Sequence, residues 1–100
     1  MKFLCICQYG HSRSVALARV LHGRGHQAVP VGAGTSPAAI PLLADWADHI
    51  VIVQPQFLSA VPAAYHKRTK LFDVGRDRWS NPYNTELLDI FTKMVVTEGW

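Results

Sequence analysis

The chain is poor in charged residues and in cysteine. Asp, Glu, Lys and Arg make up 17% of its 100 residues, and two residues are cysteine. Cys5 and Cys7 are two positions apart, so on an extended strand their side chains stand about 7 Å apart, too far for a disulfide. No second Cys-x-x-Cys pair and no ligand-spaced histidines follow, which excludes the common zinc patterns. The sequence therefore predicts no metal site and no cofactor.

Long apolar runs are also missing. No segment is long enough to span a bilayer. The start, Met1 to Cys7, is superficially similar to a signal peptide, but its apolar part is too short and polar residues soon interrupt it. Residues 1–100, 49% apolar, suffice for one core. We therefore expect a single cytoplasmic domain with no membrane partner.

Acidic residues are outnumbered. Seven Asp and Glu stand against ten Lys and Arg, which gives a net charge of +3. This balance suits an anionic substrate. The basic residues are scattered, and the run from His66 to Lys70 is short enough to be a solvated turn. We therefore expect no nucleic-acid partner.

What is present is a regular alternation of strand and helix patterns. Apolar runs predict strands at 3–6, 27–31, 49–53 and 70–73. Helical patterns cover 15–21, 37–46 with Ser36 as N-cap, 55–64, and a last segment that begins near Asn81 or at Asn84. Pro30 has no backbone N–H to donate to a neighbouring strand, which places the second strand at an edge of the sheet. The pattern predicts an α/β domain, with a four-stranded parallel sheet and helices on both faces.

The most informative segment joins the first strand to the first helix and reads Cys-Gln-Tyr-Gly-His-Ser-Arg-Ser from Cys7 to Ser14. Backbone N–H groups of the loop and of the helix N-terminus favour an anion, and the same field favours the nucleophilic thiolate. Arg13 offers a planar fork for two phosphate oxygens, and Ser14 can hydrogen-bond the leaving sulfur. The loop residues predicted to bind phosphate are Gln8, Tyr9, Gly10, His11, Ser12 and Arg13.

Polar or glycine residues follow the other strands too, namely Gly32 to Thr35, Gln54 and Asp73. Ligands bind parallel sheets at the carboxyl ends of the strands, where all of these residues fall. This convergence supports a site at that edge.

The Cys-x5-Arg-Ser spacing is similar to the signature of protein tyrosine phosphatases. The chain resembles the low-molecular-weight family, above all its short bacterial and phage branch, in three features. These are the position of the motif after the first strand, the segment Gly32 to Thr35, and the pair Asp73 and Asp77. The resemblance implies a flavodoxin-like strand order 2-1-3-4. It also implies hydrolysis of a phosphate monoester. The substrate is then either a phosphorylated protein, with phosphotyrosine preferred, or a small phosphomonoester. Cys7 is then the nucleophile of a phosphocysteine mechanism.

The general acid is either Asp73 or Asp77. Asp73 is favoured because it directly ends a predicted strand, and rigid elements place catalytic groups well. Asp77 lies on a loop that can close over a substrate. Tyr9, Trp79 and Tyr83 are candidate walls of an aromatic cleft. Trp79 is preferred because a loop gives it little core to join, whereas Tyr83, four residues before Leu87, is in a position to pack. His11 either tunes the thiolate or faces solvent.

Other functions remain open. The loop also resembles the Cys-x-x-Gly-x-Ser-x-Ser loop of sugar-transport enzyme IIB phosphocarriers, although these lack an arginine equivalent to Arg13. An arsenate reductase needs further cysteines, and none follows Cys7. Ser12 replaces the family's second loop cysteine, which argues against a redox disulfide within this loop. The family's Asp-Pro is also absent, because Asp73 precedes valine. A phosphate-binding module without turnover therefore stays a third reading. Cys5 is either a core residue or a partner for oxidised Cys7.

Overall fold

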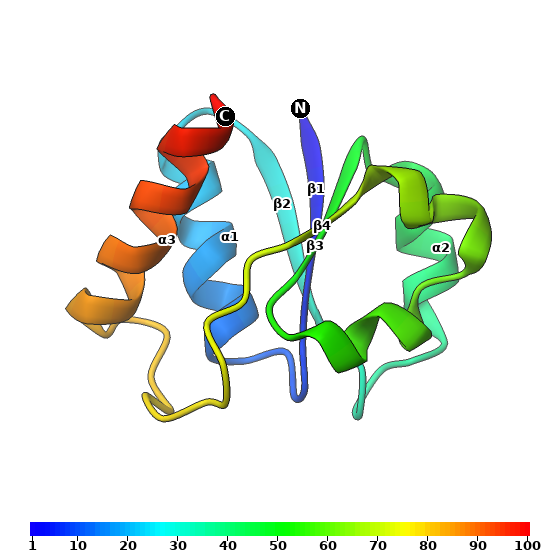
Figure 1. Ribbon diagram of the computed structural model, residues 1–100, viewed down its shortest axis with the longest axis horizontal. Helices are drawn as coiled ribbons and strands as arrows, with labels where there is room; N and C mark the ends of the chain where they lie inside the picture. Colours follow the sequence, from blue (N-terminus) through cyan, green and yellow to red (C-terminus); the bar gives the residue numbers. More distant parts are fainter.

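The computed structural model describes residues 1–100 and has a parallel four-stranded sheet at its centre (Figure 1). The strand order is β2-β1-β3-β4, and every neighbouring pair is parallel. The predicted fold class and strand order are thus confirmed. In chain order the elements are β1 (Lys2–Cys7), α1 (Arg13–Gly23), β2 (Gln27–Gly32), α2 (Ala39–Trp46), β3 (His49–Ile52), the 3₁₀ helices η1 (Pro55–Ala60) and η2 (Ala63–Arg68), β4 (Thr69–Leu71) and α3 (Thr85–Glu98).

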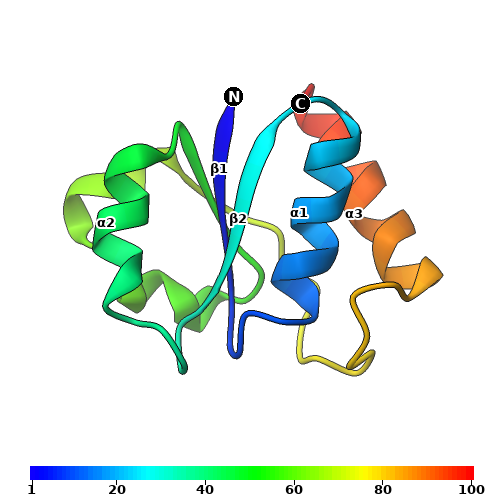
Figure 2. The ribbon, with the colours of Figure 1, turned by 180° about the vertical axis from the view of Figure 1, so that it is seen from behind.

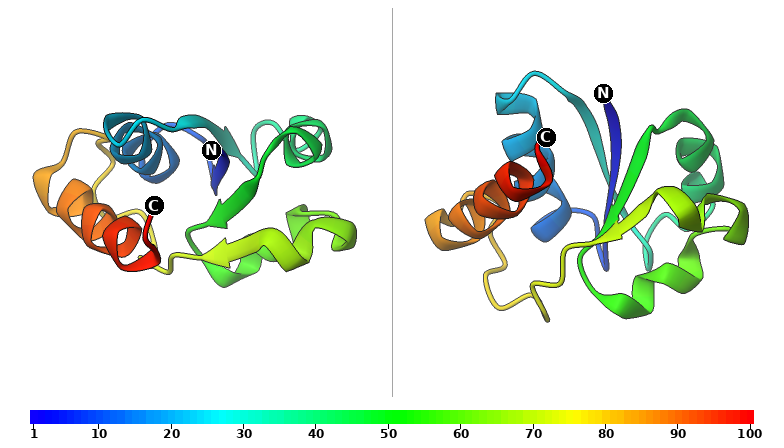
Figure 3. Two further views of the ribbon diagram at one scale, coloured as in Figure 1. Left: turned by 90° about the horizontal axis from the view of Figure 1, so that it is seen from above. Right: turned by 45° about the horizontal axis from the view of Figure 1, so that its top comes forward.

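The sheet lies between two helical layers. α1 and α3 cover one face, while α2, η1 and η2 cover the other (Figures 2 and 3). β1 is central, and its residues Phe3 to Ile6 are fully buried, as expected of a strand covered on both faces. β2 forms the edge predicted from Pro30. No helix is both long and apolar enough to cross a membrane.

Two helix predictions were wrong in detail. α2 begins at Ala39, and Ser36 does not cap it: its backbone carbonyl, not its side chain, accepts a hydrogen bond from the Ala39 N–H. The single helix predicted for 55–64 is instead η1 followed by η2. Val61 between them is extended, as the residue before a proline tends to be, and Pro62 has no N–H to continue a helix.

The last strand is shorter than predicted. β4 ends at Leu71, so Asp73 is exposed beyond the strand instead of ending it. The backbone nevertheless stays beside β3 for longer, because the N–H groups of Phe72 and Val74 donate to β3 and to the residue after it. α3 begins after Asn84, the later of the two predicted starts, whose side chain accepts a hydrogen bond from the Leu87 N–H at 3.1 Å.

The loops that follow the carboxyl ends of the strands gather at one end of the molecule. In Figure 1 they lie at the bottom, while both chain termini lie at the top. The segments concerned are 8–12 after β1, 33–36 after β2, 53–54 after β3 and 72–84 after β4. This end of the sheet is where the sequence predicted a site.

Candidate active site

Cys7 is the last residue of β1 and is 2% exposed. Its Sγ lies 3.0 Å from Ser14 Oγ, and the Gly10 N–H donates to the same sulfur at 3.2 Å. The neutral thiol donates to the Ser14 hydroxyl; once the sulfur is ionised, that hydroxyl can turn and donate to it. A thiolate would therefore have two donors in place.

The loop after Cys7 is fixed against the loop after β2. Backbone N–H groups of the second loop donate to carbonyls of the first, and a threonine hydroxyl adds a third bond. These are Ala33 N to Cys7 O at 2.8 Å, Gly34 N to Gln8 O at 2.9 Å and Thr35 Oγ1 to Tyr9 O at 3.1 Å. These three bonds hold the first loop through its carbonyl groups. They therefore occupy none of its N–H groups.

Gly10 and Gly32 make this contact possible. Gly10 has φ +77°, a conformation that side chains disfavour. A Cβ on Gly10 would stand 2.6 Å from the Gly32 backbone nitrogen, and a Cβ on Gly32 would stand 2.8 Å from the Tyr9 carbonyl oxygen. The two loops therefore meet backbone to backbone.

Arg13 opens α1 and is 3% exposed. Its Nη1 donates to Gln54 Oε1 and to the Gly75 carbonyl, both at 2.6 Å. Its Nε is buried without a partner, and no protein group accepts from Nη2. Both acceptors are neutral, and no carboxylate lies within ion-pair distance of the guanidinium. The edge of the fork that can grip two oxygens, Nε and Nη2, therefore has no protein acceptor, and no carboxylate forms an ion pair with the guanidinium.

Asp77 contacts the same loop from the segment that follows β4. The Ser12 hydroxyl donates to Asp77 Oδ2, and the N–H groups of Trp79 and Ser80 donate to Oδ1 at 3.2 and 2.9 Å. Partial burial acts to raise the pKa of Asp77, but these hydrogen bonds and the nearby charge of Arg13 outweigh it and lower the pKa below its ordinary value. Asp77 is therefore held as a carboxylate in the free protein.

Asp73 lies elsewhere. It is exposed, and its Oδ1 accepts a hydrogen bond from the Gly75 N–H at 3.0 Å, which closes a local turn. It does not line the pocket beside the loop. The reason for preferring Asp73 was that it ends a strand, and that reason fails because β4 stops at Leu71.

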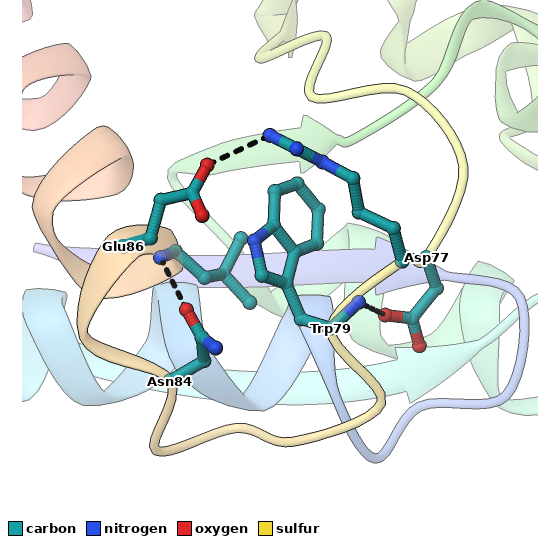
Figure 4. Close-up of polar contacts among 6 residues, drawn as sticks. Asp77, Trp79, Asn84 and Glu86 are labelled. Carbon is teal, nitrogen blue, oxygen red and sulfur yellow. Dashed lines mark hydrogen bonds and ion pairs between the residues drawn. The ribbon is translucent and has the colours of Figure 1, made fainter.

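The predicted aromatic walls are divided. Tyr9 lines the pocket, is 58% exposed and stacks on His11 with ring centres 5.8 Å apart. His11 is exposed and outside the pocket lining. Trp79 packs against the core instead, with its indole N–H buried, and Figure 4 shows the ring turned toward the first turn of α3, where Asn84 and Glu86 lie. The structure thus brings Tyr9 to the site and leaves Trp79 out.

The pocket has a volume of about 510 Å³ and is open to solvent. Sequence reasoning missed three of its residues, Gln56, Phe57 and Arg76. Gln56 and Phe57 were hidden inside a predicted helix, and Arg76 lies in the loop after the last predicted strand, where no local pattern marks it as a pocket residue. The pocket is lined by Gln8, Tyr9, Arg13, Gln54, Gln56, Phe57, Arg76 and Asp77.

Cys5 belongs to the core. It is fully buried, and burial together with the neighbouring Cys7 raises the pKa of its thiol far above the ordinary value. Both cysteines are free thiols. Their side chains differ in surroundings: Cys7 meets the loop donors, whereas Cys5 lies within the strand among apolar neighbours.

Two solved structures resemble this one over nearly its whole length. Vibrio vulnificus Wzb in complex with benzylphosphonate is 15% identical, with a TM-score of 0.73, and the match covers 97% of this chain and 95% of that one. A protein tyrosine phosphatase from Entamoeba histolytica, with Hepes in its active site, is 16% identical, with a TM-score of 0.52 and coverage of 99% and 98%.

No family model matches the sequence, and no curated protein matches it significantly. Wzb is a low-molecular-weight tyrosine phosphatase. The chain therefore has the low-molecular-weight phosphatase fold, as the resemblance of its motifs implied.

Proposed function

We propose that this protein is a cysteine-dependent phosphatase that hydrolyses a phosphate monoester, with protein phosphotyrosine as the preferred class, through a phosphocysteine intermediate. The observation that carries the proposal is that the Arg13 guanidinium is buried and has only neutral hydrogen-bond acceptors. A buried guanidinium that contacts only neutral acceptors is costly unless an anion joins it. A phosphoryl group on the free Nε–Nη2 edge supplies that anion.

The surroundings fit the same ligand. Arg13 lines the pocket next to the loop that follows the cysteine, and α1 begins at that arginine. A helix N-terminus and the N–H groups of a tight loop favour an anion. Three loop-to-loop hydrogen bonds hold this loop in place before any ligand arrives, so little reorganisation opposes binding.

In the first chemical step, the Cys7 thiolate attacks phosphorus. An S–P bond forms, the P–O bond to the alcohol or phenol breaks, and the leaving oxygen takes a proton. In the second step, water attacks phosphorus and gives up a proton, and the S–P bond breaks. Cys7 then leaves as a thiolate that accepts hydrogen bonds from Ser14 and the Gly10 N–H. Arg13 stabilises the equatorial oxygens in both steps.

Asp77 is our choice for the general acid and base. It lines the pocket, and Asp73 does not. Although it is a carboxylate in the free protein, a bound phosphate dianion places negative charge beside it and raises its pKa, which favours the protonated acid in the complex. The proton that Asp77 gives to the leaving oxygen returns to it from the attacking water.

Hydrolysis of p-nitrophenyl phosphate tests the proposal. We expect turnover by the wild type, none above background for Cys7→Ser, and retained turnover for the matched core variant Cys5→Ala. Acid quench during turnover of ³²P-labelled substrate should trap label on Cys7. Label that accumulates stoichiometrically without release of phosphate would instead indicate a phosphocarrier, and absence of both turnover and label would leave a binding module.

A further inference from the structure

We infer that Arg76 forms a second anion-binding subsite at the pocket mouth, which selects phosphotyrosine peptides that carry an acidic residue next to the phosphorylated tyrosine. The inference rests on the proposed function, because it assigns a substrate class to the same pocket. Arg76 takes no part in the chemical steps described above. Its role is to bind a carboxylate of the substrate outside the phosphate position.

Arg76 is a cation without a partner. It is exposed, it lines the pocket, and it takes part in none of the three ion pairs and none of the side-chain hydrogen bonds of the molecule. Arg78, two positions later, differs: it pairs with Glu86 at 2.9 Å and lies over the Trp79 ring at 4.6 Å from its centre. The same loop thus carries one occupied arginine and one free arginine, and the free one faces the site.

The backbone on both sides of Arg76 is held. The carbonyl of Gly75 accepts from Arg13, and the side chain of Asp77 accepts from Ser12 and from two backbone N–H groups. Arg76 therefore leaves the chain from a segment that is anchored on both sides to the phosphate loop and its arginine. The backbone at Arg76 therefore needs little ordering when a ligand binds, although its side chain does.

Nothing else in the pocket can neutralise Arg76. Three of the lining residues are glutamines, which are neutral, and two are aromatic. Asp77 is the one carboxylate, and its oxygens already accept three hydrogen bonds. Arg76 is therefore available to pair with a carboxylate of the substrate, in addition to the phosphate that Arg13 binds.

The shape of the site favours a peptide as the source of this second charge. The pocket is open, and more than half of the Tyr9 side chain is exposed beside it, stacked on the exposed His11. This pair offers a flat aromatic surface to chain residues that extend beyond the phosphorylated side chain. A carboxylate from a neighbouring Glu or Asp then reaches Arg76 at the mouth.

The test uses phosphotyrosine peptides that differ at one position, with Glu, Gln or Lys directly before or directly after the phosphotyrosine. For the wild type we expect kcat/KM to be two- to fivefold higher for the better-placed Glu peptide than for its Gln counterpart, about the effect of one solvent-exposed ion pair. Arg76→Gln should bring this ratio to about one, and Arg76→Glu should favour the Lys peptide. Arg78→Gln, the matched control on the same loop, should keep the wild-type ratio.

Each ratio is taken within one protein, so a general loss of activity does not affect it. Dissociation constants of the same peptides for Cys7→Ser, with and without Arg76→Gln, give a second readout that needs no hydrolysis. Failure of all turnover would contradict the proposed function, and these constants would still decide the role of Arg76. Equal binding of Glu and Gln peptides, or a preference for Glu that survives Arg76→Gln, would overturn the inference.

Discussion

The hydroxyl of Ser12 donates a hydrogen bond to the carboxylate of Asp77, 65 positions later in the chain. This bond joins the loop after β1 to the loop after β4. It also distinguishes the two candidate acids, because Asp77 is held at the loop after Cys7 while Asp73 closes a turn in solvent. The first prediction follows from that division.

Asp77→Asn should lower kcat/KM by about 100-fold or more for phenyl phosphate, whose leaving group needs a proton. The loss should be much smaller for p-nitrophenyl phosphate, because p-nitrophenolate leaves without one. Asp73→Asn should leave both substrates near wild type. The measurement is the pH–rate profile of each variant with both substrates, in which only Asp77→Asn loses its alkaline limb. The reverse pattern would give the role to Asp73.

Arg13→Lys keeps a positive charge but loses the planar fork and the free Nε–Nη2 edge. We expect kcat/KM for p-nitrophenyl phosphate to fall by about two orders of magnitude, the scale for loss of a preorganised donor in the transition state. Gln54→Ala removes the Nη1 acceptor and should cost less, because the Gly75 carbonyl remains. Near-normal turnover of Arg13→Lys would mean that the guanidinium does not bind the phosphate.

Ser14→Ala removes the hydroxyl that lies 3.0 Å from Cys7 Sγ. The thiolate is then a poorer leaving group, so hydrolysis of the phosphocysteine should slow more than its formation. Stopped-flow measurements should show a burst of p-nitrophenol in this variant, larger than in the wild type. Ser59→Ala, at an exposed serine bonded to the Gln56 carbonyl, is the control and should behave as wild type. An unchanged burst in Ser14→Ala would contradict the role assigned to the hydroxyl.

Gly10→Ala should destabilise the protein by about 2 kcal/mol, because a side chain at positive φ costs about 1–2 kcal/mol and the new Cβ also presses on Gly32. Turnover should fall as well, since the loop must move away from β2. Gly23→Ala, where a Cβ meets nothing within 4 Å, should be neutral or stabilising. Urea unfolding monitored by tryptophan fluorescence gives both values, and equal effects of the two substitutions would contradict the close approach.

The lowered pKa of Asp77 predicts a dependence of stability on pH. Its folded-state pKa lies below the unfolded value, so its ionised form stabilises the fold at pH values above the unfolded pKa. This contribution is lost as the pH falls through the folded pKa. Asp77→Asn should therefore lower the free energy of unfolding at pH 7 and lose this difference in acid. In a Ser12→Ala background the penalty at pH 7 should shrink, because one of the bonds is already absent.

The sheet and the conformation of the loop between Cys7 and Arg13 were predictable because their signals are local. A buried strand, a Cys-x5-Arg spacing and a helix follow one another within Lys2–Gly23, and the structure matches them closely. Pro30 was enough to place β2 at the edge. Asn84 carries its capping signal in its own side chain, and it does cap α3.

The rest of the site depended on contacts that no local pattern encodes. The sequence favoured Asp73 because it ends a predicted strand, whereas in the structure Asp77 lines the pocket and bonds to Ser12. Trp79 was expected to lack a core, but the start of α3 supplies one. The break between η1 and η2 at Pro62 does have a local signal, because proline has no N–H to continue a helix, and the prediction of one helix over 55–64 overlooked it.

The two bonds of Arg13 Nη1 span 41 and 62 positions of sequence. Contacts of such long range close only after the intervening chain has been brought together, and proteins rich in them fold slowly. The arginine of α1 therefore cannot take its place until β3 and the segment after β4 have docked. We therefore expect the guanidinium of Arg13 to become buried late in folding, after the sheet has formed.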